Sequence, residues 1–325
     1  MNPIKRILNE LNGLHYRQEY LCLAKESFPN PIHVYLVERK RIVKDITREH
    51  IFTGYRPLIF TFASSVFSPG QPPPNVEVIF SQKSIQPNGL FNKRDALARL
   101  SLRLLRKQTI DNKEICHYEG SHGQHHFLSF FHQYVIALNN QLYNKKKENV
   151  FLNNNLYKQV QIAYSVPRII SLITVSTGGL YNLFPTDLHG PLDEHYYISS
   201  LRHGGEACKQ VETARRVVMS RIHSDAYKTV YGLGKNHMQK LKTKENFSFS
   251  ESLSKTFNFP LPTSSLSYRE LELVESFERG IHKLLLYKII SSQLVNKAPF
   301  TLAHIHNSYA TWRHHNNLPG NYLLR

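Results

Sequence analysis

The chain has 325 residues, of which 41% are hydrophobic, and it carries a formal net charge of +17. This composition excludes a wholly disordered chain, and no apolar run approaches the ~20 residues that a membrane-spanning helix needs. The positive charge is spread over both halves of the sequence, so it favours anionic ligands in general without selecting one of them.

The beginning of the chain lacks the long apolar core and small-residue cleavage site of a signal peptide. Residues 1–14 read as a short amphipathic helix with one basic pair. Three cysteines, Cys22, Cys116 and Cys208, lie far apart with no paired spacing. A reduced, cytoplasmic setting is therefore the simplest expectation.

The next segments alternate in the manner of strands. Residues 32–37, 58–62 and 76–80 are rich in branched and aromatic residues, and a proline-rich loop at 68–74 separates the last two. Residues 93–107 are predicted to form a helix. On it, Leu97, Leu100 and Leu104 would share one face, and Arg99, Arg103 and Arg106 would share another. We therefore expect residues 1–150 to form an α+β domain of unknown role.

Two features of this first part invite a functional interpretation. The arginine face of the predicted helix could contact a nucleic-acid backbone, although a solvated helix face is the favoured interpretation. Histidines from His117 to His132, together with Cys116, offer ligands for a metal. Their spacing fits no established zinc pattern and their segment, 116–126, reads as a loop. The favoured interpretation is that they precede or decorate a helix at 127–143.

A polar stretch at 144–155 indicates a domain boundary, so that residues 151–325 form the second domain. A short helix at 156–164 leads into a buried strand at 169–175. Gly178-Gly179 then predicts a tight hairpin turn, because both positions accept positive φ. The chain returns through 180–187, where Asn182, Thr186 and Asp187 bring polar groups together. Pro185 lacks a backbone donor and excludes a central strand here.

A second polar segment follows a strand at 195–201. Arg202-His203-Gly204-Gly205 precedes a predicted helix at 206–214, and a strand at 217–222 comes next. Basic residues and glycines at a helix N-terminus suit a phosphate group, because unpaired N–H groups and the helix dipole favour an anion. For the Gly-Gly pair alone, a plain turn between strand and helix is the favoured interpretation.

The remaining elements are predicted from alternation and composition. Strands are expected at 227–233, 268–277, 282–291 and 302–305, and a helix at 245–257. Lys235 lies in a polar exit from the first of these strands, from which it could reach the same ligand. Six or seven strands joined by short turns suit a closed antiparallel barrel.

The order of these segments resembles that of the flavin reductase-like, FMN-binding split-barrel family over roughly residues 157–310. Asn182-Leu183-Phe184-Pro185 matches that family's Asn-x-x-Pro loop, and Ser199-Ser200-Leu201-Arg202 with a helix start at Gly205 matches its second loop. Two positions depart from the family pattern. Asp187 stands where a serine is common, and Gly205-Glu206-Ala207 replaces a Lys-Asp-Thr-like helix start. Because Glu206 would repel a phosphate, Arg202, His203 or Lys209 would have to supply the positive charge.

The resemblance implies a mainly β protein with helices, whose second domain is an antiparallel split β-barrel of Greek-key type. It implies a homodimer that binds FMN and transfers hydride from NADH or NADPH to flavin, oxygen or a partner monooxygenase. The expected cofactor-binding residues are those of the two loops and the polar exit: Asn182, Leu183, Phe184, Pro185, Thr186, Asp187, Ser199, Ser200, Leu201, Arg202, His203, Gly204, Gly205 and Lys235. No catalytic side chain is expected, because the flavin performs the hydride chemistry.

Two other function classes stay open on the sequence alone. The same barrel could hold a flavin or haem without turnover, as a binding module. The charge and the arginine face leave a nucleic-acid-binding protein as the less favoured class.

Overall fold

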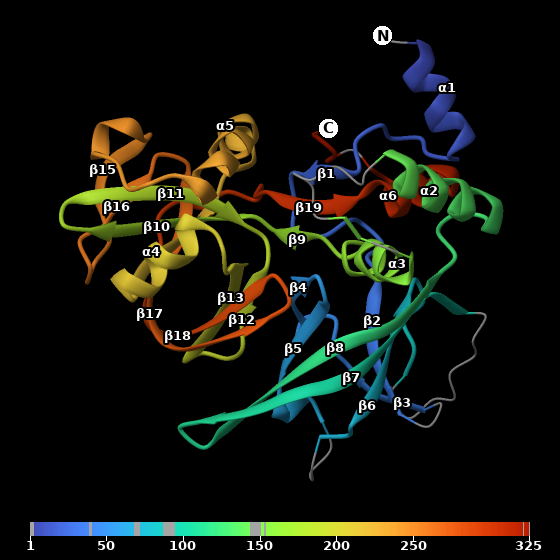
Figure 1. Cartoon of the computed structure of the whole chain (residues 1–325), viewed down its shortest axis with the longest axis horizontal. Helices are drawn as coiled ribbons and strands as arrows, with labels where there is room; N and C mark the ends of the chain where they lie inside the picture. The colour runs from blue at the N-terminus through green and yellow to red at the C-terminus, as the bar shows by residue number, and fades with distance from the viewer. Residues whose placement is uncertain are drawn as a thin grey trace.

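The computed structural model describes residues 3–38, 41–67, 72–86, 95–143, 151–152, 154–320 and 322–324. Two seven-stranded antiparallel sheets hold most of the strand residues of the described chain, and a small three-stranded sheet lies between them (Figure 1). The protein is therefore mainly β with several short helices, as the sequence predicted. No described helix has the length and apolar character needed to cross a bilayer.

The first sheet is built from the N-terminal part of the chain. Its strand order is β3-β2-β6-β7-β8-β5-β4. The sequence predicted β2, β5 and β6, and the structure confirms them. The bounds are β2 (His33–Glu38), β3 (Arg41–Asp45), β4 (Ile51–Tyr55), β5 (Leu58–Ala63), β6 (Asn75–Ser81), β7 (Ala96–Ile110) and β8 (Lys113–His125).

The second sheet is built from the C-terminal part, in the order β11-β10-β14-β17-β18-β13-β12. Its edge strands, β11 and β12, do not pair with each other, so the expected closed barrel is wrong for the described strands. The bounds are β10 (Ser171–Thr177), β11 (Leu180–Thr186), β12 (His189–Pro191), β13 (Tyr196–Arg202), β14 (Arg216–Ile222), β17 (Ser265–Arg279) and β18 (His282–Leu294).

The two sheets repeat one topology. When β2–β8 are matched in chain order with β10–β14, β17 and β18, both sheets have the same sequence of neighbours. The long hairpins β7–β8 and β17–β18 also share their irregularities. Their register shifts after Ser101 and Leu104 in the first sheet and after Glu270 and Leu273 in the second. Because β-bulges are specific features of a fold, their recurrence identifies an internal repeat. We call β2–β8 the first repeat and β10–β18 the second repeat.

Four predicted elements have the wrong type. Residues 96–107 of the predicted 93–107 helix belong to strand β7, because β7 pairs with β6 and β8 on its two sides and buries alternate residues. Residues 93 and 94 lie outside the described part. The histidine-rich segment is strand β8 rather than a loop. The predicted 227–233 strand is helix α5 (Tyr227–Gly232), where apolar residues contact a neighbouring core cluster at helical spacing.

The predicted helix at 245–257 is also wrong. It contains a 3₁₀ turn, η5 (Lys244–Asn246), and strand β15 (Phe249–Leu253), which pairs with β16 (Pro260–Pro262). The other helices agree in type with the prediction where one was made. They are α1 (Pro3–Leu11), α2 (Phe130–Tyr143), α3 (Asn154–Ala163), α4 (Glu206–Ala214) and α6 (Asn307–His315), with shorter 3₁₀ turns η1 (Ser64–Val66), η3 (Ser224–Ala226) and η4 (Leu233–Met238).

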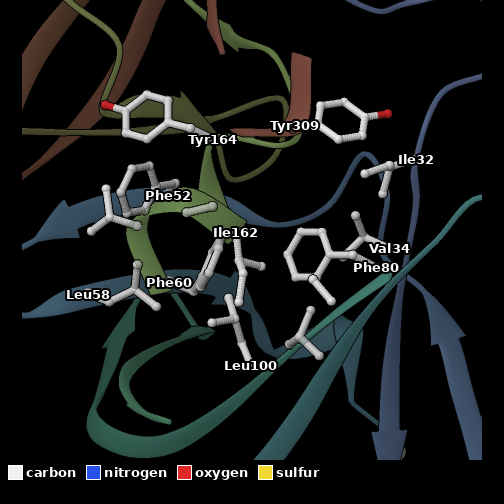
Figure 2. Packing of buried hydrophobic residues seen from close by; sticks show 14 of the residues in the cluster. Ile32, Val34, Phe52, Leu58, Phe60, Phe80, Leu100, Ile162, Tyr164 and Tyr309 are labelled. Atoms are coloured by element: carbon white, nitrogen blue, oxygen red, sulfur yellow. The ribbon is translucent and has the colours of Figure 1, made fainter. Parts of the chain in front are cut away.

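The segment near the end of the chain joins the two halves. Strand β19 (Ala303–His306) lies between β1 (Tyr20–Leu23) and β9 (Arg168–Ile169), so it does not extend the second sheet as expected. Tyr309 of α6 belongs to the same buried cluster as Val34 and Phe80 of the first repeat (Figure 2). The linker expected at 144–149 lies outside the described residues, and the division into two domains at residue 150 stays a prediction.

The two repeats pack with approximate twofold symmetry. The tip of the β7–β8 hairpin contacts the β12–β13 turn, where Lys113 Nζ lies 2.6 Å from Asp193 Oδ2. The tip of β17–β18 contacts the β4–β5 turn in the equivalent way, and the backbone N–H of Tyr55 donates to His282 Nε2 at 3.1 Å. Arg106 and Glu275, which occupy equivalent positions in the two repeats, form an ion pair across the junction. One chain therefore contains an arrangement that symmetric dimers build from two chains.

Candidate functional site

The first expected flavin segment is a strand rather than a loop. Residues 182–186 belong to β11, at the edge of the second sheet, where a proline can be accommodated without a missing ladder hydrogen bond. Asn182 is buried, and its amide donates to Gln210 Oε1 at 2.7 Å and to the Asn236 carbonyl at 3.0 Å. Leu183 and Phe184 lie in hydrophobic clusters. These side chains therefore hold the fold together.

The second expected segment also uses its polar groups internally. Ser199 Oγ lies 3.1 Å from Tyr287 Oη, and Ser200 Oγ lies 3.1 Å from His282 Nδ1. Leu201 is buried in the core, and the next residue, Arg202, donates to Tyr55 Oη at 3.0 Å. Each serine hydroxyl thus has a hydrogen-bond partner within the second repeat.

Turn η4 lies between the two expected segments. A Cβ at Gly205 would come within 3.2 Å of the His237 carbonyl, and His237 Nε2 lies 2.8 Å from the Pro185 carbonyl. His203, Gly204 and Lys235 are exposed at the surface nearby. Turn η4 thus contacts both segments, with its His237 carbonyl against Gly205 and its His237 side chain against Pro185.

A large cavity lies elsewhere, between the two repeats. Its volume is about 900 Å³, within the range of small-molecule sites. The first half contributes the segment from Asp45 to Phe52, and the second contributes residues from β12, β13, β14 and β17. Of the expected cofactor-binding residues, only Asp187 lines it. The cavity combines aromatic side chains, such as Phe52 and Tyr197, with several arginines.

Histidine and arginine side chains on the cavity wall are held in defined states. Arg168 Nε donates to the Ala163 carbonyl at 2.8 Å, and its Nη2 lies 3.2 Å from His50 Nε2. Burial, with a further contribution from Arg168, lowers the pKa of His50 to about 3, so this imidazole is neutral at physiological pH. Burial likewise lowers the pKa of His189 to about 4. Two neutral imidazoles therefore line the cavity beside a permanent cation.

Asp187 begins a chain of hydrogen bonds that leads away from the cavity. Its Oδ2 accepts from Tyr164 Oη at 2.9 Å and lies 2.7 Å from His304 Nδ1. Burial is the largest single effect and raises the pKa of this carboxyl, but the hydrogen bonds from His304 and Tyr164 and the electrostatic effect of His304 together outweigh burial, so the pKa lies below its usual value. His304 Nε2 is in turn 3.0 Å from the hydroxyl of the exposed Tyr231. Such a chain can hold or pass a proton between the cavity wall and the surface.

Histidines His117 and His125, two of the metal-ligand candidates of the sequence, have separate hydrogen-bond partners. His117 Nδ1 lies 3.0 Å from Thr61 Oγ1, and His125 Nε2 lies 3.0 Å from Gln161 Oε1. Burial lowers the pKa of each to about 3. Among the residues that the structure describes, no three potential ligand side chains come together. These histidines serve as hydrogen-bonding groups of the first repeat.

The cavity residues that sequence reasoning missed carry a recognisable signal. Arg221 and Arg269 occur in strands whose alternation places them on the buried side, in VVMSRI and YRELELV. An arginine on the inward side of a strand, in line with apolar residues such as Met219 or Leu271, is uncommon and indicates a polar site within the fold. Arg168 and His189 begin the short strands β9 and β12, and their proximity to the first half depends on contacts distant in sequence.

Comparison with known proteins finds similarity to solved structures alone. No family model matches the chain, and no curated protein matches it. An FMN-binding protein from Thermus thermophilus with bound p-hydroxybenzaldehyde is 16% identical, with a TM-score of 0.38, over 43% of this chain and 87% of its own. The NADH:FAD oxidoreductase of Streptomyces globisporus C-1027 is 9% identical, with a TM-score of 0.40, over 47% and 89%.

A third similar structure is the styrene monooxygenase flavin reductase of Pseudomonas putida S12. It is 15% identical with a TM-score of 0.38, and the match covers 46% of this chain and 93% of the reductase. Each of the three proteins is thus matched over most of its length by less than half of the present chain.

Proposed function

We propose that the protein is a flavin-dependent oxidoreductase that binds FMN in the cavity between its two repeats and oxidises NADH or NADPH. The observation that carries this proposal is the cavity itself, which joins aromatic surface and guanidinium groups in about 900 Å³. FMN presents a broad aromatic ring at one end and a phosphate at the other. A site for it needs apolar walls, a few directed polar groups and positive charge.

The residues of the cavity suit the two ends of such a molecule. Phe28, Phe52 and Tyr197 supply apolar surface for a ring. Arg168, Arg221 and Arg269 supply positive charge. The flavin, when bound, supplies the hydride chemistry, so the chain needs no nucleophile of its own. Asp187 and His304 can hold a proton at the cavity wall, through the hydrogen bond that joins them.

This proposal moves the cofactor from the segments that the sequence favoured. In those segments, the side chains of Asn182, Ser199 and Ser200 form hydrogen bonds to other residues of the second repeat, and η4 covers Gly205. The resemblance in those segments supports the choice of flavin as the cofactor class. The electron acceptor, whether free flavin, oxygen or a partner monooxygenase, follows from that class and is proposed on the same basis, as is a cytoplasmic location.

The test is a titration of the purified protein with FMN, followed by addition of NADH or NADPH under anaerobic conditions. We expect quenching of FMN fluorescence at one equivalent per chain and bleaching of the flavin absorbance by at least one of the two nucleotides. Binding without bleaching would identify a flavin-binding module without turnover. Absence of both signals at millimolar FMN would refute the proposal.

A further inference from the structure

The two repeats share one sheet geometry but differ in a few inward-facing side chains. Matching the registers places Arg221 of β14 at the position of Phe80 in β6, and Arg269 of β17 at the position of Leu100 in β7. Phe80 and Leu100 are both completely buried in the first repeat. The same positions therefore carry core residues in one repeat and cations in the other.

The difference in side chains accompanies a difference in what covers the sheet. In the first repeat, Phe80 and Leu100 belong to one hydrophobic cluster with Ile162 of α3 and Tyr309 of α6 (Figure 2). In the second repeat, the equivalent face is part of the cavity wall. Helices thus close the first repeat, whereas the second repeat presents Arg221 and Arg269 to an open space.

The protein balances the charge of one of these two arginines but not of the other. Arg221 is ion-paired with Glu26, yet its Nε has no hydrogen-bond partner. Arg269 lies over the Tyr197 ring at 5.3 Å, and no carboxylate of the described residues is within ion-pair distance of it. Burial and the proximity of Arg269 both lower the pKa of Arg221. Two neighbouring cations on a partly buried wall are unfavourable unless an anion joins them.

The acidic groups of the cavity are engaged in other interactions. Glu49 Oε2 lies 2.6 Å from Lys44 Nζ, and Asp45 Oδ1 accepts from the Thr47 hydroxyl at 2.6 Å. Asp187 accepts from His304 and Tyr164, as described above. With Glu26 occupied by Arg221, the four acidic residues of the wall leave Arg269 without a counter-charge among the described residues.

We propose that the end of the cavity at Arg221 and Arg269 is a binding site for a phosphate monoester dianion. Arg269 offers guanidinium N–H donors and a positive charge without a counter-charge, and Arg221, although paired with Glu26, adds further N–H donors; together they suit the several oxygens of a phosphate group. Identifying the phosphate as that of FMN rests on the proposed function, whereas the anion site itself does not. The first repeat, with Phe80 and Leu100 in these places, has no such site, so one site per chain is expected.

The experiment compares FMN, riboflavin and inorganic phosphate as probes of the whole chain. Arg269→Leu introduces the residue that the first repeat carries at the equivalent position. Arg269→Lys keeps the charge but loses the guanidinium fork. Arg103→Leu removes an exposed arginine of β7 and serves as the matched control. Circular dichroism verifies that each variant is folded.

Arg269→Leu is expected to weaken FMN binding by about ten- to hundred-fold and to leave riboflavin binding unchanged, because only FMN carries the charged group. Arg269→Lys is expected to weaken FMN binding less than Arg269→Leu does, and Arg103→Leu is expected to leave FMN affinity unchanged. Inorganic phosphate competes with FMN in the wild type. Wild-type affinity of Arg269→Leu for FMN, or an equal loss for riboflavin, would overturn the inference.

Inorganic phosphate separates this inference from the proposed function. The anion site is upheld if the wild type broadens the ³¹P resonance of phosphate and Arg269→Leu does not. This holds even if neither FMN nor riboflavin binds, and in that case only the proposed function fails. FMN binding that neither phosphate nor the Arg269 variants weaken would uphold the proposed function and refute the anion site. No phosphate broadening and no flavin binding would refute both.

Discussion

Replacement of Gly123 by alanine tests how closely helix α3 is held against the first repeat. Gly123 is buried in β8, and a Cβ there would meet the α3 backbone at Gln159, 3.1 Å from its Cα and 3.2 Å from its nitrogen. Asn155, at the start of α3, fixes the same place by two hydrogen bonds, 2.6 Å from the Gly123 nitrogen and 2.7 Å to its carbonyl oxygen. The added methyl group cannot be accepted unless the helix moves.

The magnitude follows from two opposing effects. Alanine restricts the unfolded chain and would stabilise the protein by about 0.4–1 kcal/mol where the native backbone accepts it. Overpacking against a backbone costs about 1–3 kcal/mol, and displacement of α3 would also strain the Asn155 hydrogen bonds. The steric cost exceeds the entropic gain, so Gly123→Ala is expected to lower the free energy of unfolding by about 1–2 kcal/mol.

Urea unfolding followed by the fluorescence of Trp312, the single tryptophan, measures this change. Trp312 lies in α6 and packs against the hydrophobic cluster that includes the first repeat, so it reports on the affected part. Gly204→Ala is the control, since a Cβ at Gly204 meets no atom within 4 Å. If Gly123→Ala were as stable as Gly204→Ala, the close approach of α3 to β8 would be refuted.

Three further outcomes are expected. Burial lowers the folded pKa of four histidines to about 3: His50, His117, His125 and His282. The unfolded chain therefore binds more protons than the folded chain between about pH 6.5 and 3, and the free energy of unfolding should fall steeply as the pH drops through this window. Urea midpoints that do not change with pH there would contradict the neutral buried imidazoles. Arg106→Glu places two negative charges opposite each other at the junction of the repeats, where both side chains are partly exposed. We expect the free energy of unfolding to fall by less than about 1 kcal/mol and to be restored when Glu275→Arg is added. Urea midpoints that the second exchange does not restore would argue against direct pairing. Arg202→Glu should leave FMN affinity unchanged, because Arg202 contacts Tyr55 outside the cavity. A ten-fold loss of FMN affinity in a fluorescence titration would indicate instead that the phosphate binds at the Gly204-Gly205 turn.

Strands were predictable where one pattern fitted their residues. Residues 76–80 are apolar at all but one position and residues 282–291 are mostly apolar, and both segments form strands. The segment around Leu100 fits two periods, since Leu97, Leu100 and Leu104 suit a helix while Ala98, Leu100 and Leu102 suit a strand. Pairing with β6 and β8 decides between them, and that information lies in distant parts of the chain.

The site was less predictable than the fold. The segments that contain Asn182 and Gly205 both contact η4, but the hydrogen bonds of Asn182 and Ser200 are made within the protein. The cavity needs both repeats, and the repeat itself is obscured in the sequence because equivalent positions carry residues as different as Phe80 and Arg221. What the two halves retain in common is the register of their strands and bulges.

The position of β19 has a consequence for how the protein reaches its native state. Tyr20 pairs with His306, and Tyr309 fills the core of the first repeat, so early and late segments complete one another. During synthesis, the N-terminal half would leave part of its apolar interior without its final cover until residues 303–310 emerge. Such long-range closure slows folding and leaves nascent chains dependent on protection from aggregation.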